Sequence, residues 1–251
     1  MSKKDINSNF AEFGSKMQTL GILAILLFVF GIISNFVAYL GIVNLILWII
    51  SLIIFFSALG EIKEVAYALN NRTLHEFRSK IIYSLIIFFI GYFFLIGGLI
   101  GLAAVIIYAP EAVGGIIALA GVIIIAIILI IISVIFEYQG WSRFQTFINN
   151  NMNMFPANIG NDASSGASLM KIAAILKLTI ILIFIAFILN VIGYFKLSSL
   201  KNMMGKPTTT SAPTTSTAPA KTPEPARKFC PNCGSPVTGD EKFCSSCGAE
   251  L

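Results

Sequence analysis

The sequence predicts an all-α polytopic membrane helical bundle with about five transmembrane helices plus interfacial helices, a disordered linker and a small C-terminal four-cysteine module. Three observations predict this fold class. The 251 residues are 57% hydrophobic and 12% charged, with a mean hydropathy of +0.86, whereas soluble domains are roughly 45–50% apolar and about 25% charged. The apolar residues are concentrated in long runs between positions 20 and 195. All four cysteines follow residue 229. This composition excludes an ordinary soluble globular protein.

Five segments have the roughly 20 predominantly apolar residues that an α-helical span needs. We expect a transmembrane domain over residues 20–200, with spans at about 20–39, 41–59, 81–108, 114–136 and 173–195. Pro110 ends the third span, and Lys177 lies a turn inside the fifth, where it can snorkel to the interface. The first apolar run could instead belong to a signal peptide, but it is longer than the usual 7–15 residues of a signal sequence.

Three polar stretches carry apolar residues at helical spacing and are expected to form interfacial helices on the membrane surface. The first is an N-terminal interfacial arm, residues 1–19, with Ile6, Phe10, Phe13 and Met17. The other two stretches, which follow the second and fourth spans, contain Ile62, Val65, Ala66, Leu69, Leu74 and Phe77, and Trp141, Phe144, Phe147 and Ile148. Short solvated connectors are the alternative interpretation. A weak repeat leaves a duplication open: the second and fourth spans end in Glu61 and Glu137, and each is followed by an amphipathic piece that ends in an Asn pair.

Lys and Arg residues near the spans predict the orientation in the cell membrane. The N-terminal arm and the loop between the second and third spans are basic, whereas the short hairpin connections carry no Lys or Arg. The N-terminus is therefore expected in the cytoplasm. Five spans would then place the C-terminus outside, but Lys196, Lys201 and Lys206 favour the inside. The side of the membrane that holds the C-terminal module stays open.

Residues 201–227 are rich in Pro, Thr, Ser and Ala. Such a low-complexity segment cannot bury enough apolar surface to fold, so we expect a flexible linker. Outside a cell such stalks are often O-glycosylated, and inside they serve as plain spacers.

The C-terminal module carries two Cys-x-x-Cys-Gly motifs, with ten residues between the two pairs. This pattern can deliver four thiolates to one tetrahedral metal ion, and each Gly permits the turn that aims backbone amides at the sulfurs. Residues 228–251 resemble the short zinc ribbons at the ends of many prokaryotic proteins. The resemblance implies that Cys230, Cys233, Cys244 and Cys247 bind one structural Zn²⁺. Iron, disulfides and redox thiols are the alternatives, and a closed four-thiolate site argues against catalysis.

The membrane part has a resemblance of its own. Its hairpin spacing, the loop from Glu61 to Lys80 and the stretch Tyr138-Gln-Gly-Trp-Ser-Arg143 resemble an archaeal polytopic membrane-protein family of unknown function. The resemblance covers about residues 15–200 and implies no activity.

Polar residues in the spans are sparse. The centres of the first four spans hold no ionisable residue, so we expect no enzyme, no catalytic residue and no cofactor-binding residue. Glu61, Glu137 and Lys177 are expected to cap or snorkel, and His75 to be a surface residue. The remaining polar residues are expected to form hydrogen bonds between helices: Asn35, Asn44, Ser51, Ser84, Ser133 and Asn190. Gly97 with Gly101, and Gly114 with Ala118, are expected to pack helices within the chain or between copies in a homo-oligomer.

The sequence therefore predicts an integral membrane protein that presents a tethered zinc ribbon to a protein partner, as a non-enzymatic anchor or scaffold in the lipid bilayer. A transporter or channel with a regulatory zinc ribbon is the alternative. Nucleic acid is a poor partner, because Arg227, Lys228 and Lys242 in the module are balanced by Asp240, Glu241 and Glu250.

Overall fold

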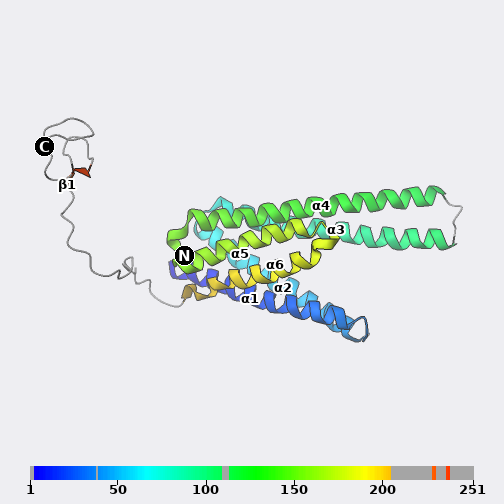
Figure 1. Cartoon of the computed structure of the whole chain (residues 1–251), viewed down its shortest axis with the longest axis horizontal. Coiled ribbons are helices and arrows are strands. Elements are labelled where there is room, and N and C mark those ends of the chain that lie inside the picture. The colour runs from blue at the N-terminus through cyan, green and yellow to red at the C-terminus, as the bar shows by residue number, and fades with distance from the viewer. Residues whose placement is uncertain (1–2, 38, 109–112, 205–227, 230–235, 238–251) are drawn as a thin grey trace. The chain divides into compact units, whose positions relative to one another are not determined.

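The computed structural model describes residues 3–37, 39–108, 113–204, 228–229 and 236–237, and divides into two units, Met1–Thr208 and Thr209–Leu251. The first unit is helical and consists of three antiparallel hairpins, α1–α2, α3–α4 and α5–α6 (Figure 1). Its helices are α1 (Lys3–Ile33), α2 (Tyr39–Ala68), α3 (Arg72–Tyr108), α4 (Val113–Asn150), α5 (Ala157–Leu176) and α6 (Ile183–Leu197), with short 3₁₀ helices η1 (Met152–Met154), η2 (Ile180–Leu182) and η3 (Ser198–Met204). The second unit contains strands β1 (Lys228–Phe229) and β2 (Pro236–Val237).

Five helical segments among the described residues are long and apolar enough to cross a membrane. They are Ile6–Ile33, Tyr39–Ala68, Arg72–Tyr108, Val113–Asn150 and Ile183–Met204. Outside the packed end of the unit, large apolar side chains on these helices face outward: Phe93 is 77% exposed and Ile117 is 67% exposed. Helices with such surfaces are typical of membrane spans.

The hydrophobic core lies at one end of the unit, where all three hairpins begin and end (Figure 1). We call this end the cap; it comprises residues 10–20, 58–81, 141–170 and 197–203. Aromatic rings form its centre: Phe13 lies 5.5 Å from Phe144, and Phe77 lies 5.2 Å from Trp141. Rings at such separations add to the stability that burial provides.

The cap corrects our interpretation of the three amphipathic stretches. They are not separate helices lying on a surface but the ends of α1, α2, α3 and α4, continuous with the apolar segments. In the predicted arm, Phe10, Phe13 and Met17 are fully buried. The apolar faces that we assigned to the membrane interface pack against one another instead. This packing removes their apolar side chains from water and forms the core of the cap.

Two neighbouring asparagines explain why the chain turns between α2 and α3. Asn70 has a φ of 46°, a left-handed conformation that Asn tolerates better than most residues. Asn71 then starts α3, where its side-chain oxygen accepts a hydrogen bond from the backbone N–H of Leu74 at 3.1 Å.

The predicted first span, 20–39, extends too far. Helix α1 ends at Ile33, and α2 starts at Tyr39. The Ser34 hydroxyl donates to the carbonyl oxygen of Gly31 at 2.9 Å, and the Asn35 amide donates to the same carbonyl at 3.0 Å. These bonds satisfy the carbonyl at the end of the helix, so the chain can turn there.

The predicted fifth span, 173–195, is not one helix. Helix α5 ends at Leu176, the chain reverses, and α6 returns antiparallel to α5. Lys196 at the end of α6 lies 2.6 Å from Asp162 near the start of α5. The backbones approach closely at Gly166, where an added Cβ would lie 3.0 Å from the carbonyl oxygen of Gly193.

The two ends of the helical unit lie side by side. Lys201 in η3 donates a hydrogen bond to Gln18 in α1 at 2.9 Å, and Gly14 permits the backbone of η3 to pack on α1. The predicted linker, 201–227, therefore begins too early: residues up to Met204 belong to η3, where Met203 packs into the core. Residues 205–227 lie outside the described part of the chain.

Candidate metal centre and helical cavity

Strands β1 and β2 bracket the first cysteine pair of the C-terminal module. They pair antiparallel, with Lys228 opposite Val237 and Phe229 opposite Pro236. The six residues between them contain Cys230, Cys233 and Gly234. The pairing of the two strands keeps the ends of this Cys-x-x-Cys segment close together, and the segment has the cysteine spacing of a metal knuckle.

The predicted ligands Cys230, Cys233, Cys244 and Cys247 themselves lie outside the described residues. Within the described part of the chain, no three His, Cys, Asp or Glu side chains gather to hold a metal. The donor set of the C-terminal module fits zinc, because four soft thiolates match its preferred tetrahedral site. Zinc held there would supply folding free energy rather than reactivity.

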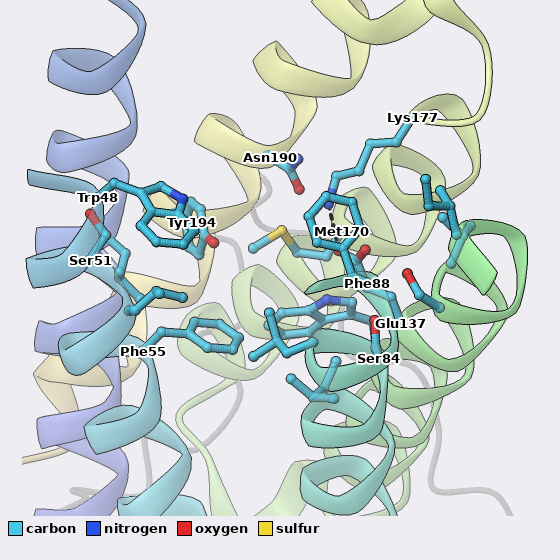
Figure 2. Close-up of a pocket in the computed structure, with 18 residues that line it drawn as sticks. Trp48, Ser51, Phe55, Ser84, Phe88, Glu137, Met170, Lys177, Asn190 and Tyr194 are labelled. Carbon is cyan, nitrogen blue, oxygen red and sulfur yellow. Dashed lines mark hydrogen bonds and ion pairs between the residues drawn. The ribbon is translucent and has the colours of Figure 1, made fainter. Parts of the chain in front are cut away.

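A cavity of about 370 Å³ lies within the helical unit, mainly between α2, α3, α4 and α6, with Leu20 of α1 and Met170 of α5 also lining it (Figure 2). Its walls are mostly apolar and aromatic, with Trp48 and Phe55 from α2, Phe88 from α3 and Trp141 from α4. Seven polar residues also line it: Ser51, Ser84, Ser133, Glu137, Lys177, Asn190 and Tyr194. Six of them were singled out in the sequence as separate polar positions, and the structure brings those six together around one space.

An ion pair forms part of this wall. Lys177 directly follows α5, and its ammonium lies 2.7 Å from Oε1 of Glu137 on α4 (Figure 2). The side chains are 35% and 21% exposed, so neither is fully solvated. We expected both residues only to cap or snorkel; the structure shows instead that they join two hairpins. Glu61 also forms an ion pair, with Lys16, and joins α2 to α1 within one hairpin.

Two of the remaining polar residues of the spans, Ser51 and Asn35, differ from our expectation. The Ser51 hydroxyl donates to the Leu47 carbonyl of its own helix at 2.9 Å, and Asn35 bonds within its own turn. Interhelical hydrogen bonds were therefore the wrong prediction for these two residues. Ser84 and Ser133 are buried on facing helices.

We expected Gly97, Gly101 and Gly114 to lie where helices pack closely, and this prediction was wrong for Gly97 and Gly114. Added Cβ atoms would meet α4 side chains at Gly98 and Gly101, whereas Gly97 and Gly114 face open space. The true contact row is spaced by seven residues: buried Ser84, Gly91 and Gly98 on α3 oppose buried Ala126, Ser133 and Gly140 on α4. A period of seven is the signal of two helices packed along a continuous seam, and it was present in the sequence.

The single histidine, His75, packs edge-on against Tyr67, with ring centroids 4.7 Å apart. Its neighbour Glu76 forms ion pairs with two arginines, with Oε1 2.9 Å from Arg72 and Oε2 3.0 Å from Arg143. These contacts tie the start of α3 to the end of α2 and to the last turns of α4 in the cap.

Comparison with known proteins identifies the C-terminal module. Residues 229–251 match the family model of a zinc-ribbon domain, which implies structural zinc binding. No curated protein and no solved structure matches the chain. The resemblance of residues 15–200 to an archaeal family of unknown function thus stays a prediction. The chain combines a zinc-ribbon domain with helices apolar enough to span a membrane.

Proposed function

We propose that this protein is a non-enzymatic membrane anchor that presents a tethered zinc ribbon to a protein partner. The match of residues 229–251 to a zinc-ribbon domain carries the proposal. A closed four-thiolate site leaves no position for a reacting water, so its natural role is to fold a small recognition module. The helical unit supplies the anchor, because most of its surface outside the cap is apolar.

The proposal includes a membrane orientation. All three hairpins begin and end at the cap, so the helical unit leaves the bilayer on the side where it entered, however deeply each hairpin inserts. Most Lys and Arg residues from Lys16 to Lys201 lie in cap segments, and the others, Lys171, Lys177 and Lys196, lie on or beside the α5–α6 hairpin. Residues 21–57 and 82–133 contain no Lys or Arg. The positive-inside rule then places the cap in the cytoplasm.

The same reasoning assigns a compartment to the zinc ribbon. Residues 205–227 contain no apolar run that could cross a bilayer. We therefore place the module in the cytoplasm with the N-terminus. In this proposal the fifth segment returns to the cap rather than crossing alone, which agrees with the preference of Lys196, Lys201 and Lys206 for the inside.

The proposal is tested by affinity purification of the full chain after chemical crosslinking in its own cells. Two control proteins are purified in the same way: a chain that ends at Pro207, and a full chain in which Cys230 and Cys244 are changed to serine. We expect the partner to co-purify only with the intact module. Equal recovery with all three proteins would contradict the scaffold proposal.

A transporter or channel with a regulatory zinc ribbon is the second candidate, and the cavity with its Glu137–Lys177 pair favours it. Paired charges at the wall of a helical bundle are a recurrent feature of substrate pathways. Reconstitution in vesicles distinguishes the two proposals. A solute flux that is lost in Glu137→Gln but kept in Glu61→Gln would favour transport over anchoring.

A further inference from the structure

The cavity between the hairpins has an apolar part and a polar part. Trp48 and Phe55 of α2 face Phe88 of α3 across it, and Met170 of α5 lies near its middle (Figure 2). Its volume of about 370 Å³ is at the small end of the range for ligand pockets, about 300–1,000 Å³. The apolar part offers water few hydrogen-bond partners, so a hydrocarbon chain gains by entering it.

The polar part is electrically balanced. Glu137 and Lys177 are the charged residues among those lining the cavity, and they pair with each other. An anionic or cationic ligand head would leave one surplus charge in partly desolvated surroundings, which is costly. An uncharged hydroxyl avoids this cost. It can accept from a free proton of the Lys177 ammonium and donate to the second carboxylate oxygen of Glu137.

We propose that the cavity binds an uncharged single-chain amphiphile drawn from the membrane, such as a long-chain alcohol. Its tail lies among Trp48, Phe55 and Phe88, and its hydroxyl lies beside the Glu137–Lys177 pair. The source is the bilayer, because the helices that form the walls are those apolar enough to span it. The site rests on the membrane anchoring proposed above, but it is independent of the zinc ribbon and of the proposed partner.

The test uses the full chain in vesicles of zwitterionic lipid and three photoreactive probes with the same tail: a long-chain alcohol, the matching fatty acid and the matching alkyl trimethylammonium. Crosslinked residues are mapped by mass spectrometry. We expect the alcohol to label cavity residues at least about tenfold more than either ion, a factor that corresponds to about 1.4 kcal/mol. Excess unlabelled alcohol should remove this labelling. Equal labelling by all three probes would overturn the proposal.

Two variants make the test specific. Ser51→Phe fills the cavity from α2 and should abolish labelling by the alcohol, whereas Ile53→Phe changes a 64%-exposed position on the same helix and should not. Glu137→Gln leaves Lys177 unbalanced and should switch the preference to the fatty acid. Glu61→Gln, outside the cavity, should keep the preference for the alcohol. Unchanged labelling in Ser51→Phe, or an unchanged preference in Glu137→Gln, would refute the site.

Discussion

Lys201 and Gln18 are 183 positions apart in the chain, yet the Lys201 ammonium donates a hydrogen bond to Oε1 of Gln18 at 2.9 Å. The contact joins the last helical segment of the unit to the first. It follows from the reversal of the chain between α5 and α6, because Asp162 and Lys196 close the base of that hairpin. The cap is therefore built from both ends of the helical unit, and this arrangement underlies the orientation that we propose.

The α5–α6 hairpin should be sensitive to any side chain at Gly166. In Gly166→Leu the new Cβ would lie 3.0 Å from backbone atoms of Gly193 and Leu197. We expect the overpacked variant to lose about 1–3 kcal/mol of stability and to melt earlier in detergent. Gly121→Leu is the matched control, since a Cβ there meets nothing within 4 Å, and it should be neutral or stabilising. A melting temperature for Gly166→Leu as high as that of the control would argue against the hairpin.

The Glu137–Lys177 pair should show strong coupling. Glu137→Gln leaves a partly buried ammonium without its partner, and we expect a loss between the roughly 0–1 kcal/mol of exposed pairs and the 3–5 kcal/mol of buried ones. The double variant Glu137→Gln with Lys177→Met should recover part of this loss. A double-mutant cycle of thermal unfolding measures the coupling. The control is Arg72→Ala, which removes a 91%-exposed partner of Glu76 and should cost little. Strict additivity at Glu137 and Lys177 would show that the pair does not form.

The aromatic centre of the cap should carry much of the stability of the helical unit. Phe77 is fully buried and lies 5.2 Å from Trp141 and 4.8 Å from Phe144. Phe77→Ala should cost about 3–5 kcal/mol, as other large-to-small changes in cores do. Phe93→Ala, on the exposed surface of the same helix, should cost much less. Chemical unfolding followed by tryptophan fluorescence would report the difference, and equal costs would show that the cap is not a packed core.

Zinc should be bound once per chain and by all four cysteines. Elemental analysis of the purified full chain should find one zinc, and a single change such as Cys244→Ser should remove it, because the module has little core of its own. His75→Ala should leave the zinc content unchanged, since His75 packs against Tyr67 in the cap. Full zinc content in Cys244→Ser, or iron in place of zinc, would contradict the assignment.

Much of this architecture could be predicted from the sequence, because apolar runs and cysteine spacing are local signals. The apolar helices and the zinc ribbon are of this kind. The cap could not be predicted, since an amphipathic stretch looks the same whether its apolar face meets a membrane or another helix. Phe10 and Phe147 are brought together only by the tertiary fold, with ring centroids 6.0 Å apart.

The reversal after α5 was missed for a related reason. Hydropathy joins residues 173–195 into one run, although the helix ends at Leu176 and Lys177 contacts Glu137 forty positions earlier. The cavity is a further consequence of that long-range pairing. Its polar residues come from separate helices, so no local pattern marks them as neighbours.

The central claim, a cytoplasmic zinc ribbon anchored by helical hairpins, is tested most directly by labelling the cysteines. The chain contains only the four cysteines of the module, so the unmodified protein can be used. A membrane-impermeant thiol reagent is applied to intact cells and to lysed membranes, with and without a zinc chelator. The account predicts labelling only after lysis, and only once zinc has been removed. Labelling of intact cells after chelation would place the module outside and contradict the return of all three hairpins to one side.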